Sequence, residues 1–178
     1  MTGLLPVRAA LLPDVPAIAR VHVETWRSAY PGIVPEKYLL DMTEARQAEL
    51  WAATIRRARG ADTVLVAEGA KGAGVVGFGS CGRARRGGDM GEVFTLYVAN
   101  DWQGQGAGRA LLTGMLAHLH GHGINQATIW VLSANPSRFF YEAMGGKRQA
   151  ERQEPFSGMV LDETAYGWSD LGAWLAEQ

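Results

Sequence analysis

The residues from 103 to 108 have the types and spacing of a phosphate-binding loop. Three glycines fall within six residues, immediately before a helical apolar pattern begins. The first main-chain N–H groups of a helix have no partner inside the helix, and the helix dipole is positive at that end. Glycine leaves these groups uncovered, so a phosphate could bind them directly. The loop consists of Gln103, Gly104, Gln105, Gly106, Ala107 and Gly108.

Two familiar phosphate loops do not fit this stretch. A Walker loop requires Gly-Lys-Ser/Thr after four spacer residues, which the sequence does not have here. A dinucleotide fingerprint requires glycine at the position that Arg109 occupies. Neither nucleotide-binding motif is therefore present.

The segments on either side of the loop are predicted to be a strand and a helix. Residues 92–98 alternate in a way that suits a strand buried on both faces. From Gly106 onward the apolar spacing is helical and forms a wide stripe. That stripe consists of Leu111, Leu112, Met115, Leu116 and Leu119.

This stretch resembles the Gln/Arg-x-x-Gly-x-Gly/Ala signature of the GNAT superfamily of acyl-CoA-dependent N-acetyltransferases, in the form Gln103-x-x-Gly106-x-Gly108. A second likeness follows the strand predicted at 127–132, where Asn135 opens a short helix that contains Tyr141 and ends in glycine. A glycine-rich turn between a strand and a helix is common in α/β proteins. The two signatures together, in the family's order and separation, favour the family.

The resemblance implies a single α+β domain over residues 1–178, with a mixed, mostly antiparallel central sheet flanked by helices. In this fold the fourth and fifth strands splay apart, and the pantetheine of acetyl-CoA lies in the gap. Its amides are expected to pair with main-chain groups of Leu96, Tyr97 and Val98. Residues 103–109 are expected to hold the pyrophosphate. The expected cosubstrate is therefore acetyl-CoA as acyl donor, and no metal is expected.

The transfer of an acetyl group to an amine needs a base and is helped by an acid. An amine arrives mostly as ammonium and must lose a proton, and the departing thiolate is stabilised by gaining one. The resemblance implies that Tyr141 is the acid near the coenzyme sulfur, although a core tyrosine beside Phe139 and Phe140 is the alternative. Asn135 is expected to cap the helix and to contact the pantetheine, or to cap it without touching a ligand.

Two glutamates are candidates for the general base. The resemblance implies a catalytic or water-holding role for Glu92, at the start of the central strand, where a partly dry cleft could raise the carboxyl pKa. Glu24 on the first helix is the competitor, and either could be an ordinary surface carboxylate. His118 and His122 are four residues apart but have no Cys or acidic partner at ligand spacing. With His120, we interpret them as cations near a helix C-terminus rather than metal ligands.

The walls of the acceptor site are expected from the first helical pair. A helix is predicted from Val15 to about residue 29, with Trp26 in its core stripe and His22 on its surface. The resemblance implies that this helix and the next wall the acceptor. Trp26 and Tyr30 are the candidate substrate-binding residues.

The remaining elements follow from caps, alternation and turn residues. Asp14 and Thr43 are expected to cap the first two long helices. A loop with three arginines, residues 83–89, is interpreted as a solvated turn, and alternatively as a contact for an acidic acceptor. Strands are predicted at 5–10, at 62–68 paired with 75–83, and at 147–154 paired with 159–168, and a short helix at 169–176.

Composition limits the class of protein. A chain of 178 residues with 47% hydrophobic residues is long enough for one domain with a substantial core. A net charge of −1 gives no general attraction to nucleic acid or anionic membranes, so neither is an expected partner. Prolines and Arg8 interrupt the first apolar residues, so no signal peptide is expected, and no apolar run approaches a membrane span. The single cysteine, Cys81, excludes an internal disulfide and favours a cytoplasmic location.

Two functions from different classes remain. The first is an enzyme that moves an acetyl group from acetyl-CoA to a primary amine, on a small molecule, a peptide N-terminus or a lysine side chain, by direct attack in a ternary complex. The second is a catalytically weak acyl-CoA-binding sensor or partner subunit with the same fold. The presence of Tyr141, Glu92 and Glu24 favours the enzyme. The sequence does not name the amine, and the protein is expected to be a monomer or a homodimer.

Overall fold

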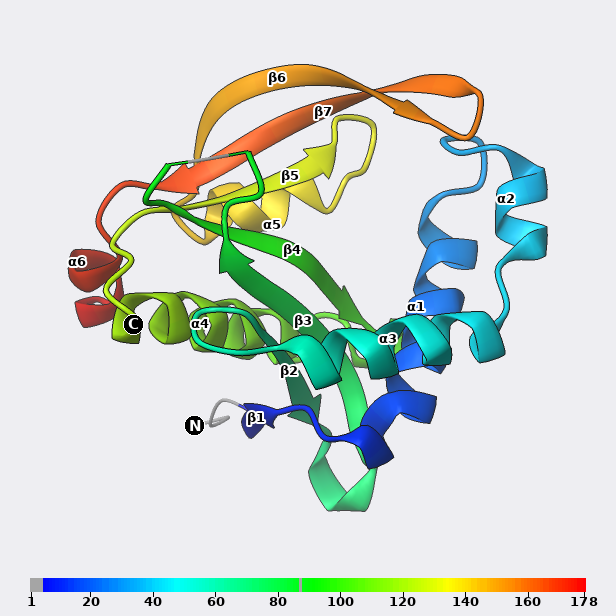
Figure 1. Cartoon of the computed structure of the whole chain (residues 1–178), viewed down its shortest axis with the longest axis horizontal. Helices are drawn as coiled ribbons and strands as arrows, with labels where there is room; N and C mark the ends of the chain where they lie inside the picture. Colours follow the sequence, from blue (N-terminus) through cyan, green and yellow to red (C-terminus); the bar gives the residue numbers. More distant parts are fainter. Residues whose placement is uncertain (1–4, 87) are drawn as a thin grey trace.

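One seven-stranded sheet organises the chain (Figure 1). The computed structural model describes residues 5–86 and 88–178. Residues 1–4 of the predicted domain and Gly87 of the arginine-rich loop lie outside the described residues. The strands are β1 (Val7–Ala9), β2 (Thr63–Glu68), β3 (Val75–Arg83), β4 (Gly91–Val98), β5 (Ala127–Leu132), β6 (Lys147–Phe156) and β7 (Met159–Trp168).

The sheet is mixed and mostly antiparallel, as predicted. Its order is β1-β2-β3-β4-β5-β7-β6. All neighbouring strands run antiparallel except β4 and β5, which are parallel. A parallel pair needs a crossover, and the predicted helix after the glycine loop supplies it.

Helices cover both faces of the sheet. On one face α4 (Ala107–Gly121) and α6 (Leu171–Ala176) pack in a core cluster that includes Leu111 and Met115. On the other face α1 (Val15–Ala29) and α3 (Glu44–Arg57) pack in a second cluster that includes Ile18 and Trp51. The shorter helices are α2 (Glu36–Asp41), α5 (Arg138–Ala143) and the 3₁₀ turns η1 (Leu12–Asp14), η2 (Ala70–Gly72) and η3 (Asn100–Trp102). This arrangement of helices around a mixed sheet confirms the predicted α+β class.

The fourth and fifth strands splay apart, as the resemblance implied. β4 pairs with β5 only from Gly91 to Val93, opposite residues 127–129. Just beyond that point the β3–β4 register shifts, so that Cys81 faces Val93 and Ser80 faces Thr95. The extra residue in β4 is a bulge, which bends the strand and increases its twist. Meanwhile β5 stays paired with β7 along its whole length, so it diverges from β4 together with the β6–β7 hairpin.

The β6–β7 hairpin reaches across to α1 and α2 (Figure 1). Its turn lies within the predicted segment, and Ser157 (φ 45°) and Gly158 (φ 84°) both have left-handed backbones. Two successive residues of this kind are typical of a tight hairpin turn. Phe156 and Leu161, near the turn, pack in a third cluster with Trp26 and Tyr30. The hairpin and the end of α1 therefore form opposite walls of one space.

One of the two predicted helix caps is different in the structure. Thr43 caps α3 as predicted, because its hydroxyl accepts a hydrogen bond from Arg46 N at 3.3 Å. The side chain of Asp14 does not cap α1. Its carboxylate instead accepts from Leu11 N at 2.8 Å and pairs with Arg8 at 2.7 Å. Asp14 therefore stabilises the preceding 3₁₀ turn, η1, and not the start of α1 as the sequence predicted. No helix among the described residues is long and apolar enough to cross a membrane.

Candidate active site

A cleft of about 740 Å³ lies where β4 and β5 diverge. Phe94–Val98 of β4 line one side and Ile129–Leu132 of β5 line the other. The end of α1, the start of α5 and the β6–β7 hairpin complete the walls. Beyond Val93, the edge of β4 that faces β5 pairs with no strand of the described chain. Apart from Val98 O, which accepts from Gln103, the main-chain groups on that edge could pair with a ligand.

The glycine loop joins this cleft at the start of α4. Gly104 (φ 72°) and Gly106 (φ 90°) have left-handed backbones, and a Cβ at either would meet no atom within 4 Å. The glycines are therefore required by conformation, and the space above them is open. Gln103 Nε2 donates to Val98 O at 3.2 Å, and Gln105 Nε2 donates to Asp101 O at 2.7 Å. The two glutamines hold the loop in place before α4, and the first main-chain N–H groups of a helix have no partner inside the helix.

The other residues of the predicted pyrophosphate site, Ala107, Gly108 and Arg109, differ in their exposure to solvent. Arg109 is exposed and lies in the first turn of α4. Ala107 is buried beneath the loop, and a Cβ on Gly108 would approach Phe140 Cζ to 3.4 Å. Gly108 therefore allows α4 to pack closely on α5, while the space beside Gly104 and Gly106 is open.

Tyr141 and Asn135 both line the cleft, where the sequence analysis placed them. Tyr141 is 4% exposed, and its hydroxyl has no hydrogen-bond partner among the described residues. Burial raises the pKa of Tyr141 above its ordinary range, and the hydroxyl of Tyr30 adds to the rise. Asn135 Oδ1 accepts from Ser137 N at 2.9 Å, and its Nδ2 donates to Tyr30 Oη at 3.3 Å. Asn135 thus fixes the start of α5 and links it to the end of α1.

Neither of the two predicted bases lines this cleft. Glu92 lies where β4 and β5 are still paired, and its Oε2 accepts from Arg85 N at 3.1 Å. Glu24 lines a separate pocket of about 690 Å³ between α1 and the β4–α4 connection, beside Arg20 and Arg27. Neither predicted base is therefore among the residues that line the cleft with Tyr141.

Two other glutamates, both from the β6–β7 hairpin, line the cleft. Glu163 Oε2 accepts from Arg152 Nε at 2.6 Å, and the side chain is 17% exposed. Glu154 pairs with Arg86 at 2.9 Å and with Arg152 at 3.5 Å. Sequence reasoning missed both, because the hairpin carries many charges and local alternation does not say which of them faces the cleft. Only the strand pairing identifies Glu163 as a cleft residue. It lies opposite Leu132, at the end of β5 that is no longer paired with β4.

Trp26 and Tyr30 line the cleft, as the sequence analysis expected for acceptor-binding residues. Their rings contact each other edge to face at 4.6 Å. Burial raises the pKa of Tyr30, the hydrogen bond from Asn135 opposes the rise, and the charge of Glu163 adds to it. Burial likewise raises the pKa of Tyr97, which is also among the residues that line the cleft.

His22 was predicted to lie on the surface, and the structure corrects this. Its ring stacks on Tyr97 at 5.3 Å, and Nδ1 accepts a hydrogen bond from Trp51 Nε1 at 2.9 Å. Burial lowers the pKa of His22 to about 4. His22 lies four residues before Trp26, which is the spacing of one helix face. The sequence analysis placed His22 on the surface because histidine is polar.

The arginine-rich loop contacts the outside of the cleft. The guanidinium of Arg85 lies 4.2 Å from the centre of the Phe94 ring, and Arg86 pairs with Glu154. Neither arginine is among the residues that line the cleft. These contacts favour a structural role over the alternative, a contact for an acidic acceptor.

The histidines of α4 and the cysteine have local partners. His118 Nε2 is 3.2 Å from Gly60 O, and His122 Nδ1 is 2.8 Å from His118 O. Within residues 5–86 and 88–178, no group of three or more His, Cys, Asp or Glu side chains could hold a metal ion. Cys81 is buried in the sheet, which raises the pKa of its thiol to about 12.

Comparison with known proteins identifies the family. The family model for the Acetyltransferase (GNAT) family matches residues 21–146, which is more than half of the chain. The chain belongs to the GNAT acetyltransferase family. It is therefore an acyltransferase, and the glycine loop and Tyr141 both fall within the matched residues.

Relatives of this GNAT protein agree with that assignment. The chain is 38% identical over 172 residues to the uncharacterised N-acetyltransferase YuaI of Bacillus subtilis, covering 96% of each chain. Among solved structures, PaiA N-acetyltransferase of Thermoplasma acidophilum, in complex with coenzyme A, matches with a TM-score of 0.70 at 19% identity, over 91% of this chain and 98% of that one. A phosphinothricin acetyltransferase of Sinorhizobium meliloti, in complex with acetyl-CoA, matches with a TM-score of 0.68 at 20% identity, over 93% and 88%. At such identities the two structures support the fold.

Proposed function

We propose that this enzyme transfers the acetyl group of acetyl-CoA to a primary amine, by direct attack in a ternary complex. The observation that carries the proposal is one continuous cleft, which is lined by Gln103 of the glycine loop, the edge of β4 that β5 leaves, and Tyr141. The two fold neighbours whose structures contain coenzyme A or acetyl-CoA support the same donor.

The donor fits the groups present along β4 and α4. The open N–H groups at Gly104, Gly106 and the first turn of α4 would bind the pyrophosphate, with Arg109 adding positive charge nearby. The main chain of residues 96–98, on the edge of β4 that β5 leaves, would bind the pantetheine amides as an added strand would. Bound acetyl-CoA supplies the activated acetyl group, and the protein supplies orientation and proton transfer.

Tyr141 would protonate the departing thiolate. A general acid must hold its proton at the working pH, and the raised pKa keeps the Tyr141 hydroxyl protonated through the neutral range. Burial fixes the ring beside Phe140 at 5.2 Å, so the hydroxyl has little freedom to turn away.

We assign the base to Glu163 in place of Glu92 or Glu24. Glu163 lines the cleft, and its Oε1 has no partner among the described residues, whereas Oε2 is held by Arg152. A partly buried ammonium loses its proton more readily than one in water, because burial disfavours the charged form. Glu163 can then take that proton directly, while Glu92 could act only through intervening water.

Initial rates of thiol release test the proposal. With acetyl-CoA and an amine both varied, a ternary complex predicts double-reciprocal lines that intersect. Parallel lines, together with acetyl groups found on the protein itself, would instead indicate a covalent acyl-enzyme and overturn direct attack.

A further inference from the structure

The charged residues that line the cleft have one sign. Glu154 and Glu163 line it, and no Lys, Arg or His of the described chain does. Arg86 and Arg152 contact these carboxylates from outside the lining, at 2.9 Å and 2.6 Å. The arginines hold both carboxylates in position, and the charged side chains that line the cleft are these two carboxylates.

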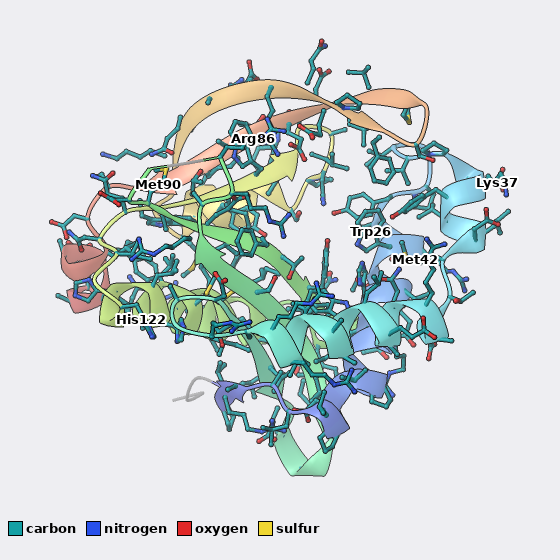
Figure 2. The ribbon with its side chains drawn as sticks, viewed as in Figure 1. Trp26, Lys37, Met42, Arg86, Met90 and His122 are labelled. Atoms are coloured by element: carbon teal, nitrogen blue, oxygen red, sulfur yellow. The ribbon has the colours of Figure 1, made fainter. Side chains whose placement is uncertain are left out.

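Aromatic rings surround the same end of the cleft. Trp26, Tyr30 and Phe156 line it, and Figure 2 shows Trp26 projecting from α1 into the space beneath the hairpin. The Trp26 ring lies 6.2 Å from Phe156 and 4.6 Å from Tyr30. Aromatic faces attract cations, and ring clusters beside carboxylates are suited to bind ammonium groups.

There are two carboxylates and only one reacting amine. The proposed mechanism uses Glu163 for the proton of that amine, and an amine that attacks must be neutral. Glu154 and the ring faces then remain for a second charge, because a carboxylate offers about four lone-pair sites and the arginines do not fill them all. An acceptor with a carboxylate or phosphate would face two carboxylates, whose arginine partners lie outside the lining.

The rings also limit the size of the acceptor. Phe156 contacts Tyr38 of α2 at 4.6 Å as well as Trp26 of α1, so side chains of the hairpin and the helices bridge this end of the cleft. A polypeptide would need an open groove here. From these observations, and resting on the proposed function, we propose that the natural acceptor is a small alkyl amine that carries a second positive charge, of the diamine class.

A panel of four acceptors of equal chain length tests this proposal. The panel is butylamine, terminal diaminobutane, aminobutyl-trimethylammonium and ω-aminobutanoate, each compared by kcat/KM for thiol release at one pH near neutrality. The trimethylammonium compound has a permanent charge and a single reactive amine, so it removes the twofold statistical advantage of the diamine. We expect both dications to exceed butylamine by about tenfold or more, and aminobutanoate to be the poorest.

Variants test whether the named residues cause the preference. Glu154→Gln and Phe156→Leu should each lower the ratio of aminobutyl-trimethylammonium to butylamine by about three- to tenfold. Glu151→Gln is the matched control, since Glu151 lies on the same strand, pairs with Arg148 and is outside the lining. It should leave the ratio unchanged.

The outcomes separate the two proposals. If butylamine is acetylated as well as the dications, or aminobutanoate is acetylated better, the cationic acceptor is overturned while acetyl transfer to amines stands. If Glu151→Gln lowers the ratio as much as Glu154→Gln, general surface charge and not the cleft causes the preference, which also overturns the proposal. Thiol release that no amine accelerates would overturn the proposed function itself.

Discussion

In the mechanism that we propose, the acid step depends on the hydroxyl of Tyr141. Tyr141→Phe keeps the ring and its packing but removes the proton, so kcat should fall by about 10- to 1000-fold while acetyl-CoA binding changes little. Only the protonated Tyr141 can act as an acid, so the parent should lose activity as the pH rises through the raised pKa of Tyr141. The pH–rate profile of the mutant should lack this fall at high pH. Tyr166→Phe is the control, because Tyr166 is a buried tyrosine outside the lining. Collapse of acetyl-CoA binding in Tyr141→Phe would make Tyr141 a packing residue.

Glu163 carries the corresponding prediction for the base. Glu163→Gln keeps the shape and can still accept from Arg152, but it cannot take a proton from ammonium, so kcat/KM should fall by about 100-fold. Glu92→Gln and Glu24→Gln should produce much smaller losses, because neither residue lines the cleft. Steady-state kinetics of the three variants decide among them. The largest loss in Glu92→Gln would point to a base acting through water.

At the residue scale, the sequence predicted the groups within signatures and missed those brought in by pairing. Tyr141, Asn135, Trp26 and Tyr30 all line the cleft. Glu154 and Glu163 enter it only because β7 pairs with β5 and turns away from β4. No spacing rule along the chain contains that information, since strand partners are distant in sequence.

The join between β4 and α4 is the element that the sequence predicted best, because apolar spacing changes there from a strand period to a helical one. Its function can be tested at Gly106. Gly106→Glu places a negative charge in the open anion site, and it should remove the stabilisation that acetyl-CoA gives the parent protein. That stabilisation is about 2.7 kcal/mol at a hundredfold excess over Kd, or roughly 5–10 °C in Tm.

Gly123→Glu is the control for this experiment. Gly123 follows the opposite end of α4, also has a left-handed backbone (φ 77°), and has no atom within 4 Å of an added Cβ. Both variants should lose similar intrinsic stability, but only Gly106→Glu should lose the thermal shift. Gly108→Glu is a poorer test, because Phe140 packs close to that position. An unchanged shift in Gly106→Glu would place the pyrophosphate elsewhere.

The packing of α1 and α3 on the sheet depends on a neutral His22. The folded pKa is about 4, below the ordinary value of 6.5, so the unfolded chain binds more protons between these pH values. The free energy of unfolding should therefore be fully present above pH 6.5 and fall as pH drops toward 4, by up to about 3 kcal/mol. Denaturant unfolding followed by tryptophan fluorescence measures it. His22→Phe should weaken that pH dependence, and an equal dependence in the variant would assign it to other groups.

At the element scale, the strand order and the divergence of β4 from β5 were predicted from the resemblance to the family. The pattern of apolar residues did not predict them. The alternation of apolar and polar residues predicted both hairpins, and the turn residues 155–158 fixed the position of the second hairpin. The divergence of β4 from β5 depends on the bulge between Val93 and Thr95 and on where the hairpin packs, which are tertiary facts. The same holds for Asp14, whose carboxylate found a nearer partner in Arg8.

At the scale of the whole molecule, one sheet supports both core clusters and the cleft, and we propose that residues 1–178 form one domain. The glycine loop lies at the start of α4 on one face, and the candidate acceptor residues Trp26 and Tyr30 lie at the end of α1 on the other. Residues of α1 and of the glycine loop line one cleft between β4 and β5, and we propose that donor and acceptor meet there from opposite sides. Monomer or homodimer remains the expectation for its assembly.

Identification of the products tests the central claim most directly. Purified protein is incubated with acetyl-CoA and diaminobutane, and free thiol and amine products are quantified together by mass spectrometry. Direct transfer predicts a monoacetylated amine and free coenzyme A in equal amounts, with neither formed when Tyr141→Phe and Glu163→Gln are combined. The account would be contradicted if free coenzyme A and acetate accumulated while neither diaminobutane nor butylamine gave an acetylated product.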